Sequence, residues 1–204
     1  MQRLIQRAFR RARIPMSYSN GFNPHPQLSF ATALPVGYTS SAEWLDVRLE
    51  TEMEDSSFLK AMNAALPKGY VIMEAFKVDD RISALSAMMC SCEYTASIYI
   101  EDMDAARLMA GVDKLLGGPI MVEKRTKGGL RTVDIRPQVE SVSCVDGEGC
   151  LIMKIKGQLN AAGSLSVELL LGSLFASVGR EPGETRVHRD RVIFSNDMQP
   201  YAAF

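Results

Sequence analysis

The spacing of apolar residues at the start of the chain predicts an amphipathic helix over Met1–Arg13. Apolar side chains recur there at intervals of three and four positions, which places them on one helical face. The opposite face carries four arginines: Arg3, Arg7, Arg10 and Arg11. Pro15 ends the helix, because the residue before a proline is disfavoured in the helical conformation.

After this helix the pattern changes to short strands. Residues Leu28–Leu34 form an apolar stretch bounded by turn formers, and Glu43–Glu50 alternates polar and apolar positions, so each segment predicts a strand. Helical spacing returns between Asp55 and Leu66, and Tyr70–Lys77 predicts another strand. The first part of the chain is therefore expected to have the order α-β-β-α-β.

The second part follows a similar rhythm with more strands. Its predicted helices follow caps at Asp102 and Ser164. A turn at Lys127-Gly128-Gly129 predicts a hairpin between two of the strands. The predicted strands cover Cys92–Ile100, Ile120–Arg125, one long or broken stretch from Leu130 to Cys144, Cys150–Lys156 and Thr185–Phe194.

These elements predict an α+β fold made of two ferredoxin-like split βαβ halves with mainly antiparallel sheets. The N-terminal half covers residues 1–85 and lacks its initial strand, whereas the C-terminal half covers residues 86–204 and contains an inserted hairpin. A missing strand leaves a bare sheet edge, which invites pairing with another chain. We therefore expect either a homodimer that forms through this exposed edge or a native protein longer than this chain.

Composition places the chain among ordinary globular proteins. It has 204 residues, of which 47% are hydrophobic and 23% are charged, and its net charge is −1. No apolar run is long enough to span a membrane, and the N-terminus has no secretory signal, so a cytoplasmic protein is expected. The four cysteines lack the spacing of zinc ligands, and free thiols are expected, with no metal and no cofactor.

The near-neutral net charge is the sum of regions with opposite charge. The first 41 residues contain five arginines and no acidic residue. Arginine suits phosphate groups because its planar guanidinium donates two parallel hydrogen bonds. Beside the arginine-rich helix lies a loop whose side chains could stack on bases and bond to them, so the two together predict a surface for single-stranded RNA. The loop residues concerned are Asn20, Phe22, Asn23 and His25.

A solvated helix face is the alternative interpretation of the same arginines, and it stays open here. The same two interpretations apply to two further basic clusters. One cluster lies near the predicted hairpin and comprises Lys124, Arg125, Lys127, Arg131 and Arg136. The other lies on the last predicted strand and comprises Arg186, His188, Arg189 and Arg191.

His25 is the candidate catalytic residue, because prolines on both sides hold its imidazole in a stiff loop suited to general acid–base chemistry. Its alternative role is packing within the loop. Glu43 and Asp46 are candidate acids, although an exposed strand face is the favoured explanation for both. No nucleotide-binding, metallopeptidase or serine-hydrolase motif is present, which favours a protein without catalytic activity.

The segment from Arg7 to Pro26 contains Arg-Ala-Phe-Arg-Arg-Ala and Gly-Phe-Asn-Pro-His-Pro, and it resembles a family of radical-SAM-linked proteins of unknown function. The resemblance continues through Leu34-Pro35-Val36-Gly37 and Glu43-Trp44-Leu45-Asp46-Val47. Members of that family begin with an additional strand, which this chain lacks. The resemblance implies a radical SAM enzyme as partner, and tRNA or other RNA modification as the process.

The sequence is compatible with three functions. The first is a non-catalytic module that binds RNA or presents a substrate to a radical SAM enzyme. The second is an RNA-acting enzyme that uses His25 as general acid or base. The third is a protein-interaction scaffold that docks through the open sheet edge.

Overall fold

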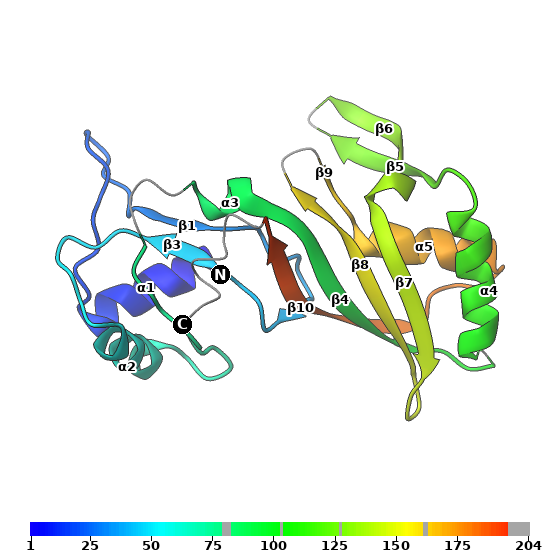
Figure 1. Cartoon of the computed structure of the whole chain (residues 1–204), viewed down its shortest axis with the longest axis horizontal. Helices are drawn as coiled ribbons and strands as arrows, with labels where there is room; N and C mark the ends of the chain where they lie inside the picture. Colours follow the sequence, from blue (N-terminus) through cyan, green and yellow to red (C-terminus); the bar gives the residue numbers. More distant parts are fainter. Residues whose placement is uncertain (79–82, 103, 127, 161–162, 196–204) are drawn as a thin grey trace. The chain divides into compact units, whose positions relative to one another are not determined.

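Internal contacts divide the chain into two units, which we describe separately (Figure 1). The computed structural model describes residues 1–78, 83–102, 104–126, 128–160 and 163–195. Within these ranges, unit 1 comprises residues 1–32 and 44–85, and unit 2 comprises residues 33–43 and 86–195. The chain therefore leaves unit 1 after Thr32, contributes residues 33–43 (the inserted segment) to unit 2, and returns at Trp44.

Unit 1 packs two helices and a two-stranded sheet around one core. Its elements are α1 (Gln2–Ala12), β1 (Leu28–Phe30), β3 (Leu45–Val47) and α2 (Asp55–Ala65). Strands β1 and β3 are antiparallel. The rings of Phe9 on α1 and Phe58 on α2 lie 5.8 Å apart between centroids, and Met62 is fully buried beside them. Burial of these large side chains holds the two helices together.

Helix α1 forms where the apolar spacing predicts it. Ile5, Ala8 and Phe9 are buried along one face. The helix ends at Arg13, whose left-handed backbone (φ 54°) lies two residues before Pro15.

The strand predicted over Tyr70–Lys77 is wrong, because this segment pairs with no other strand in the described structure. The side chain of Asn63 takes the place of a neighbouring strand: its amide nitrogen donates to the carbonyl of Ile72 (2.9 Å), and its oxygen accepts from the backbone N–H of Ile72 (2.7 Å). The backbone polar groups of Ile72 are thus satisfied without a sheet.

Unit 2 is built on a larger sheet in which the main strands run in the order β2-β10-β4-β8-β7. All neighbours on this path are antiparallel except β2 and β10, which are parallel. Strand β2 (Thr39–Ser40) comes from the inserted segment, and a short helical turn, α3 (Leu85–Met88), precedes the other strands. The elements that follow α3 are β4 (Met89–Tyr99), α4 (Ala105–Leu116), β5 (Met121–Thr126), β6 (Gly129–Asp134), β7 (Val139–Asp146), β8 (Leu151–Asn160), β9 (Gly163–Ser164), α5 (Val167–Ser177) and β10 (Glu184–Phe194).

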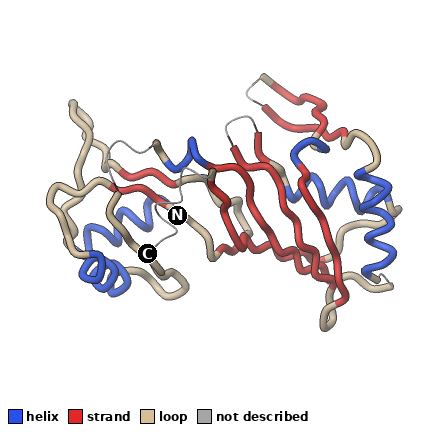
Figure 2. The backbone as a smooth tube through the Cα atoms, viewed as in Figure 1, coloured by secondary structure: helices blue, strands red, loops and turns tan. Residues whose placement is uncertain are grey.

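Helices α4 and α5 lie on one side of this sheet (Figure 2). Alternate residues of β4 are buried, including Cys92, Tyr94 and Ala96, as expected for a sheet with one covered face. Gly111 on α4 lets α5 approach closely, because a Cβ at this position would lie 2.5 Å from a methyl carbon of Val178. The side chains of Asp104 and Ser166 cap the two helices, so the caps predicted at Asp102 and Ser164 are wrong by two residues.

Strands β5 and β6 form a separate antiparallel hairpin within unit 2. The predicted stretch from Leu130 to Cys144 is broken into β6 and β7 by a 3-10 turn, Arg136–Gln138, that contains Pro137. Lys127 of the predicted hairpin turn lies outside the described residues.

The predicted α+β fold class is confirmed, and its sheets are mostly antiparallel. In unit 2 the elements β4, α4, β7, β8, α5 and β10 follow the order β-α-β-β-α-β, with the β5–β6 hairpin inserted after α4. The ferredoxin-like character of the two halves, and their extents of 1–85 and 86–204, stay predictions. Among the described residues no helix is both long and apolar enough to cross a membrane.

Candidate nucleic-acid interface

The exposed face of α1 carries three guanidinium groups that the protein itself does not use. Arg3, Arg7 and Arg10 are all exposed, whereas the apolar face of the helix is buried. Within the described part of the chain, these three side chains make no hydrogen bond or ion pair. An arginine whose donors are all free can bind an external phosphate without first breaking an internal contact.

Arg11, the fourth predicted arginine, has a structural contact. Its Nε and Nη2 atoms donate to the carbonyl oxygen of Ala65, at 3.0 and 2.7 Å. Ala65 is the last residue of α2, so the guanidinium satisfies one of the carbonyls that have no partner inside that helix. The positive charge also lies at the negative end of the helix dipole. Arg11 therefore connects α1 to α2.

The loop that carries the other candidate residues is closed by main-chain contacts at its base. Tyr18 and Pro26 form an isolated antiparallel bridge. The backbone N–H of Ser19 donates to the carbonyl of His25 (2.8 Å), and the N–H of His25 donates to the hydroxyl of Ser19 (2.9 Å). In Figure 1 the loop is the blue segment that projects from unit 1 between α1 and β1. Its ends are fixed, and residues 20–24 form the tip.

Phe22 lies at this tip and its side chain is completely exposed, at 108% of the reference accessibility. The preceding residue, Gly21, has a φ of 122°, a conformation that other residues rarely adopt. Asn20 and Asn23 on either side are also exposed. The loop therefore presents an aromatic ring, flanked by amide groups, directly to solvent.

His25 is exposed, and within the described part of the chain its imidazole makes no hydrogen bond or ion pair. None of the described carboxylates therefore orients the ring, as one would in a catalytic dyad. No described hydrogen bond or ion pair joins the loop residues to the arginines of α1. A shared concavity between these two sets of residues stays a prediction.

The predicted acids Glu43 and Asp46 each have an internal partner. Glu43 forms an ion pair with Arg189 at 2.8 Å, and both side chains are largely buried. Asp46 accepts from the backbone N–H of Leu85 at 3.3 Å. Each contact is explained by a structural role.

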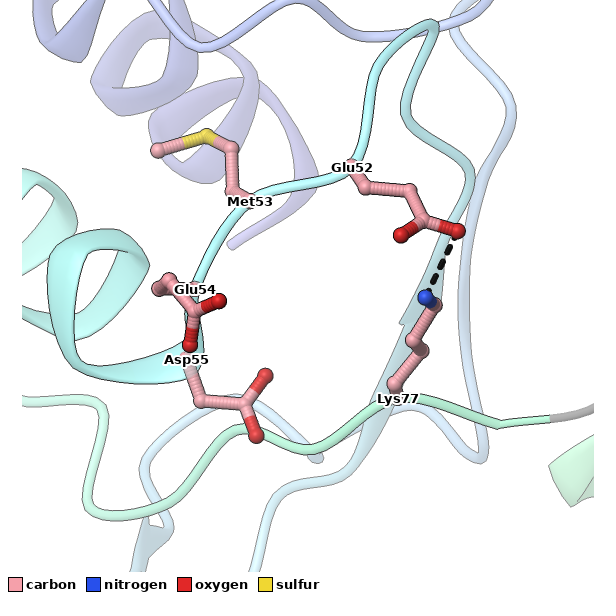
Figure 3. Close-up of a pocket in the computed structure, with 5 residues that line it drawn as sticks. All are labelled: Glu52, Met53, Glu54, Asp55 and Lys77. Atoms are coloured by element: carbon pink, nitrogen blue, oxygen red, sulfur yellow. Dashed lines mark ion pairs between the residues drawn. The ribbon is translucent and has the colours of Figure 1, made fainter.

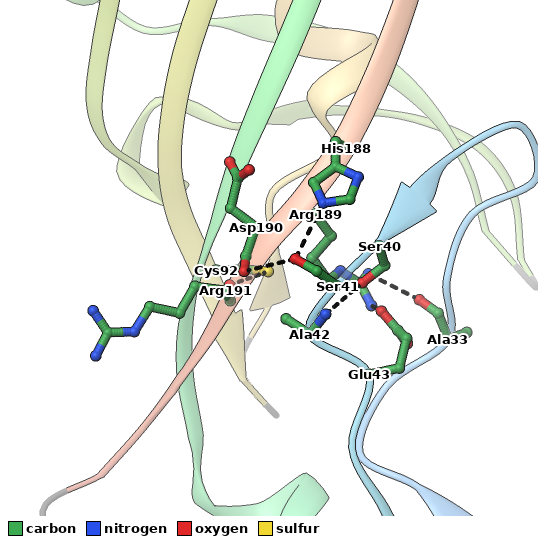
Figure 4. A network of polar contacts seen from close by, with 10 residues as sticks. All are labelled: Ala33, Ser40, Ser41, Ala42, Glu43, Cys92, His188, Arg189, Asp190 and Arg191. Carbon is green, nitrogen blue, oxygen red and sulfur yellow. Dashed lines mark hydrogen bonds and ion pairs between the residues drawn. The ribbon is translucent and has the colours of Figure 1, made fainter. Parts of the chain in front are cut away.

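Arg189 is the centre of a buried polar cluster in unit 2 (Figure 4). Besides Glu43, it donates to the carbonyl of Ala33 (3.1 Å), and its guanidinium carbon lies 5.7 Å from the centre of the Tyr94 ring. Ala33 and Glu43 are the first and last residues of the inserted segment, so one side chain holds both ends of that segment. Burial alone would lower the pKa of Arg189, but Tyr94 and Glu43 raise it, and the cation is kept.

The remaining groups of this cluster, Cys92 and Tyr94, are held in their neutral forms. Burial raises the pKa of the Cys92 thiol and the pKa of the Tyr94 phenol. The Cys92 sulfur donates to the carbonyl of Arg191 at 3.0 Å. A neutral thiol is a poor nucleophile, so this buried cysteine is not a candidate catalytic group.

Next to the cluster, His188 on β10 is held between two hydroxyl groups. Its Nδ1 lies 2.8 Å from the Thr39 hydroxyl, and its Nε2 lies 3.1 Å from the Ser41 hydroxyl. These contacts connect β10 to the inserted segment. Sequence patterns do not reveal Thr39 and Ser41 as partners, because they lie 149 and 147 positions from His188 and no local signal links them.

Asp190 occupies an irregular position in the β10–β4 ladder, where the register shifts between Arg189 and Arg191. Its carboxylate accepts from the Thr95 hydroxyl at 2.6 Å and lies 3.7 Å from the ammonium group of Lys154. A bulge of this kind turns a side chain out of the normal alternation. Asp190 thus neutralises part of the positive charge on this face of the sheet.

A pocket in unit 1 has the opposite charge to the α1 face (Figure 3). Its lining is Glu52, Met53, Glu54, Asp55 and Lys77, and the Lys77 ammonium forms an ion pair with Glu52 at 2.6 Å. Asp55 starts α2, where a negative charge favours the helix dipole. These carboxylates repel phosphate, so the pocket does not extend the phosphate-binding surface predicted for α1.

All four cysteines are free, and the described residues contain no group of three or more side chains suited to hold a metal ion.

A family model matches residues 1–167, which is most of the chain. The chain belongs to the DUF2344 family, described as uncharacterized proteins conserved in bacteria. The family description gives neither a ligand nor a link to radical SAM enzymes. No curated protein matches the chain.

The matched range covers some of the candidate surfaces and leaves others out. The α1 face, the Phe22 loop and the β5–β6 hairpin all lie within residues 1–167. Strand β10, with His188 and Arg189, lies beyond it. The DUF2344 match therefore includes the predicted RNA-binding residues of unit 1 and leaves out the polar network of β10.

Proposed function

We propose that this protein binds single-stranded RNA through unit 1, as a non-catalytic module. In this proposal Arg3, Arg7 and Arg10 hold phosphates, and Phe22 stacks on a base. Asn20, Asn23 and His25 add hydrogen bonds from the same loop. Arg11 contributes positive charge, while two of its donors remain committed to Ala65.

The main support for the proposal is the fully exposed ring of Phe22 on a loop with fixed ends. An aromatic ring that is exposed to water does not gain the favourable free energy that burial would give it. A nucleic-acid base is a suitable partner, because every base has a flat π-face and stacking tolerates any sequence.

The arginines of α1 supply the complementary charge. Three free guanidinium groups on one helical face, in a region without acidic residues, create a local positive field although the whole chain is nearly neutral. Phosphate contacts of this kind give affinity and salt dependence without sequence specificity.

The proposed partner is a radical SAM enzyme that modifies RNA, and the proposed site of action is the cytoplasm. The family resemblance of the Arg7–Pro26 segment supports this partner.

Two alternative functions have less support than RNA binding. One is general acid–base catalysis by His25, and the other is a homodimer or scaffold that forms through the open sheet edge. A His25→Ala variant that loses turnover of RNA but keeps its binding favours the enzyme.

The test is the affinity of the whole protein for a fluorescent single-stranded RNA, measured by anisotropy. Phe22→Ala should weaken binding by about five- to 150-fold, because stacking contributes roughly 1–3 kcal/mol per base. Phe22→Trp, which keeps a stacking surface, should restore it.

Val36 supplies the matched control, since its side chain is also fully exposed, at 102%, on a turn of unit 2. Val36→Ala should leave RNA affinity unchanged. Equal affinities of the wild type, Phe22→Ala and Val36→Ala would refute the stacking role of Phe22.

A further inference from the structure

The β5–β6 hairpin of unit 2 contains a pair of like charges that face each other directly. In its register Lys124 lies opposite Arg131, and Val122 lies opposite Val133 on the same face. Val122 is buried and Val133 is half-buried, so this face turns toward the body of unit 2 at the base of the hairpin. The two cations continue the same face toward the turn.

Two positive charges opposite each other weaken a hairpin, because directly opposed like charges repel. A two-stranded sheet is only marginally stable by itself, so the repulsion acts on an element whose free energy of folding is already small. Within the described part of the chain, neither Lys124 nor Arg131 forms a hydrogen bond or ion pair that would relieve it. An external anion between the two side chains would remove the repulsion.

Two other charged residues near the hairpin, Arg136 and Asp134, already have internal partners. Arg136 donates from Nε to the carbonyl of Leu116, the last residue of α4, at 2.8 Å. It also donates from Nη1 to the carbonyl of Val139 at 3.2 Å. Asp134 accepts from the backbone N–H groups of Ile120 and Arg136. The structure thus separates Arg136, a helix cap, from Lys124 and Arg131.

We propose that Lys124 and Arg131 form a second phosphate-binding site, which takes the backbone of the same nucleic acid that unit 1 binds. The nature of this ligand rests on the function proposed above, whereas the site itself rests on the paired cations of the hairpin. A nucleic acid fits better than a lipid surface, because the described part of the cationic face carries no exposed apolar side chain. Leu130, which is 63% exposed, lies on the opposite face beside Arg125.

The test is the double variant Lys124→Gln and Arg131→Gln, compared with the wild type. Its affinity for single-stranded RNA should fall, and the slope of log affinity against log salt should become shallower by about 1.4, which corresponds to two lost phosphate contacts. Its thermal midpoint should not fall, because the substitution removes a repulsion. The matched control is Lys60→Gln with Lys68→Gln, which removes two exposed charges from unit 1.

A second arm separates this site from the unit 1 interface. The triple variant Arg3→Gln, Arg7→Gln and Arg10→Gln should keep the contribution of the hairpin, so that adding the hairpin substitutions weakens its binding further. If only the triple variant loses RNA affinity, the hairpin proposal fails and the proposed function stands. If only the hairpin variant loses affinity, the function assigned to α1 fails, and the hairpin binds the RNA backbone without α1.

Vesicles that contain anionic lipid test the other source of phosphate. A hairpin variant that loses vesicle binding while its RNA affinity and salt slope match the wild type would overturn the proposal in favour of a membrane contact. Unchanged RNA binding with no vesicle binding by any of the proteins would also overturn it.

Discussion

Helix α1 and strand β10 each carry four basic residues, but the two elements use them differently. On β10, Arg189 pairs with Glu43, Arg186 pairs with Glu184, and His188 contacts two hydroxyl groups. On α1, Arg11 alone has a partner among the described residues. The density of basic residues therefore does not show which donors are available to an external phosphate, whereas the internal contacts of each side chain do.

Removal of Arg189, the most buried of these basic side chains, should have the largest effect on stability. Arg189→Met should destabilise the protein by about 3–5 kcal/mol, because it leaves the Glu43 carboxylate largely buried without its partner. Chemical denaturation measures this change. Arg186→Met is the matched control on the same strand, and its exposed side chain predicts no measurable change. Similar losses in both variants would contradict the structural role of Arg189.

A smaller effect distinguishes neighbouring arginines of α1. Arg11→Gln should lower stability by about 1 kcal/mol, because it removes two hydrogen bonds to the end of α2 at an exposed site. Arg10→Gln should leave stability unchanged and weaken RNA binding. Thermal melts of both variants, each with its RNA affinity, provide the measurement. A destabilised Arg10→Gln protein would show that the two arginines were assigned the wrong roles.

The smallest expected effect is on pH dependence. Burial raises the pKa of Cys92 above its ordinary value of 9.0 in the folded state, so the unfolded chain loses this proton first as pH rises. Stability from this group is complete below the unfolded pKa and declines as pH rises toward the folded pKa. Denaturation midpoints between about pH 7 and 10 should fall less steeply for Cys92→Ala than for the wild type. Parallel pH profiles would contradict the burial of the thiol.

Local signals were sufficient to predict several elements. Helix α1 has regular apolar spacing and a proline beyond its end, and the structure places it at Gln2–Ala12. Strand β10 alternates over many residues and lies at Glu184–Phe194, as expected. In both cases the residues that define the element are neighbours in the sequence, so periodicity is enough to find it.

Other features depend on residues far apart in the sequence. Tyr70–Lys77 has a strand-like pattern, but the Asn63 side chain satisfies the backbone of Ile72 instead of a strand. Arg10 and Arg11 are indistinguishable by pattern, because only the position of Ala65 separates their roles. Likewise, the sequence pattern does not distinguish Arg189 from its exposed neighbours, because its partners Glu43 and Ala33 are far away in the sequence.

The proposed function depends above all on phosphate binding by the free guanidinium groups of α1, and the salt dependence of RNA binding tests this role. The affinity for single-stranded RNA is measured over a range of salt concentrations for the wild type, for Arg3→Gln with Arg7→Gln and Arg10→Gln, and for a control. The control is Lys60→Gln with Lys68→Gln and Lys114→Gln, which removes three exposed charges elsewhere.

The slope of log affinity against log salt should become shallower by about 2 in the arginine variant, because each lost phosphate contact removes about 0.7. The control should keep the wild-type slope. An arginine variant with the affinity and slope of the wild type would contradict RNA binding through α1.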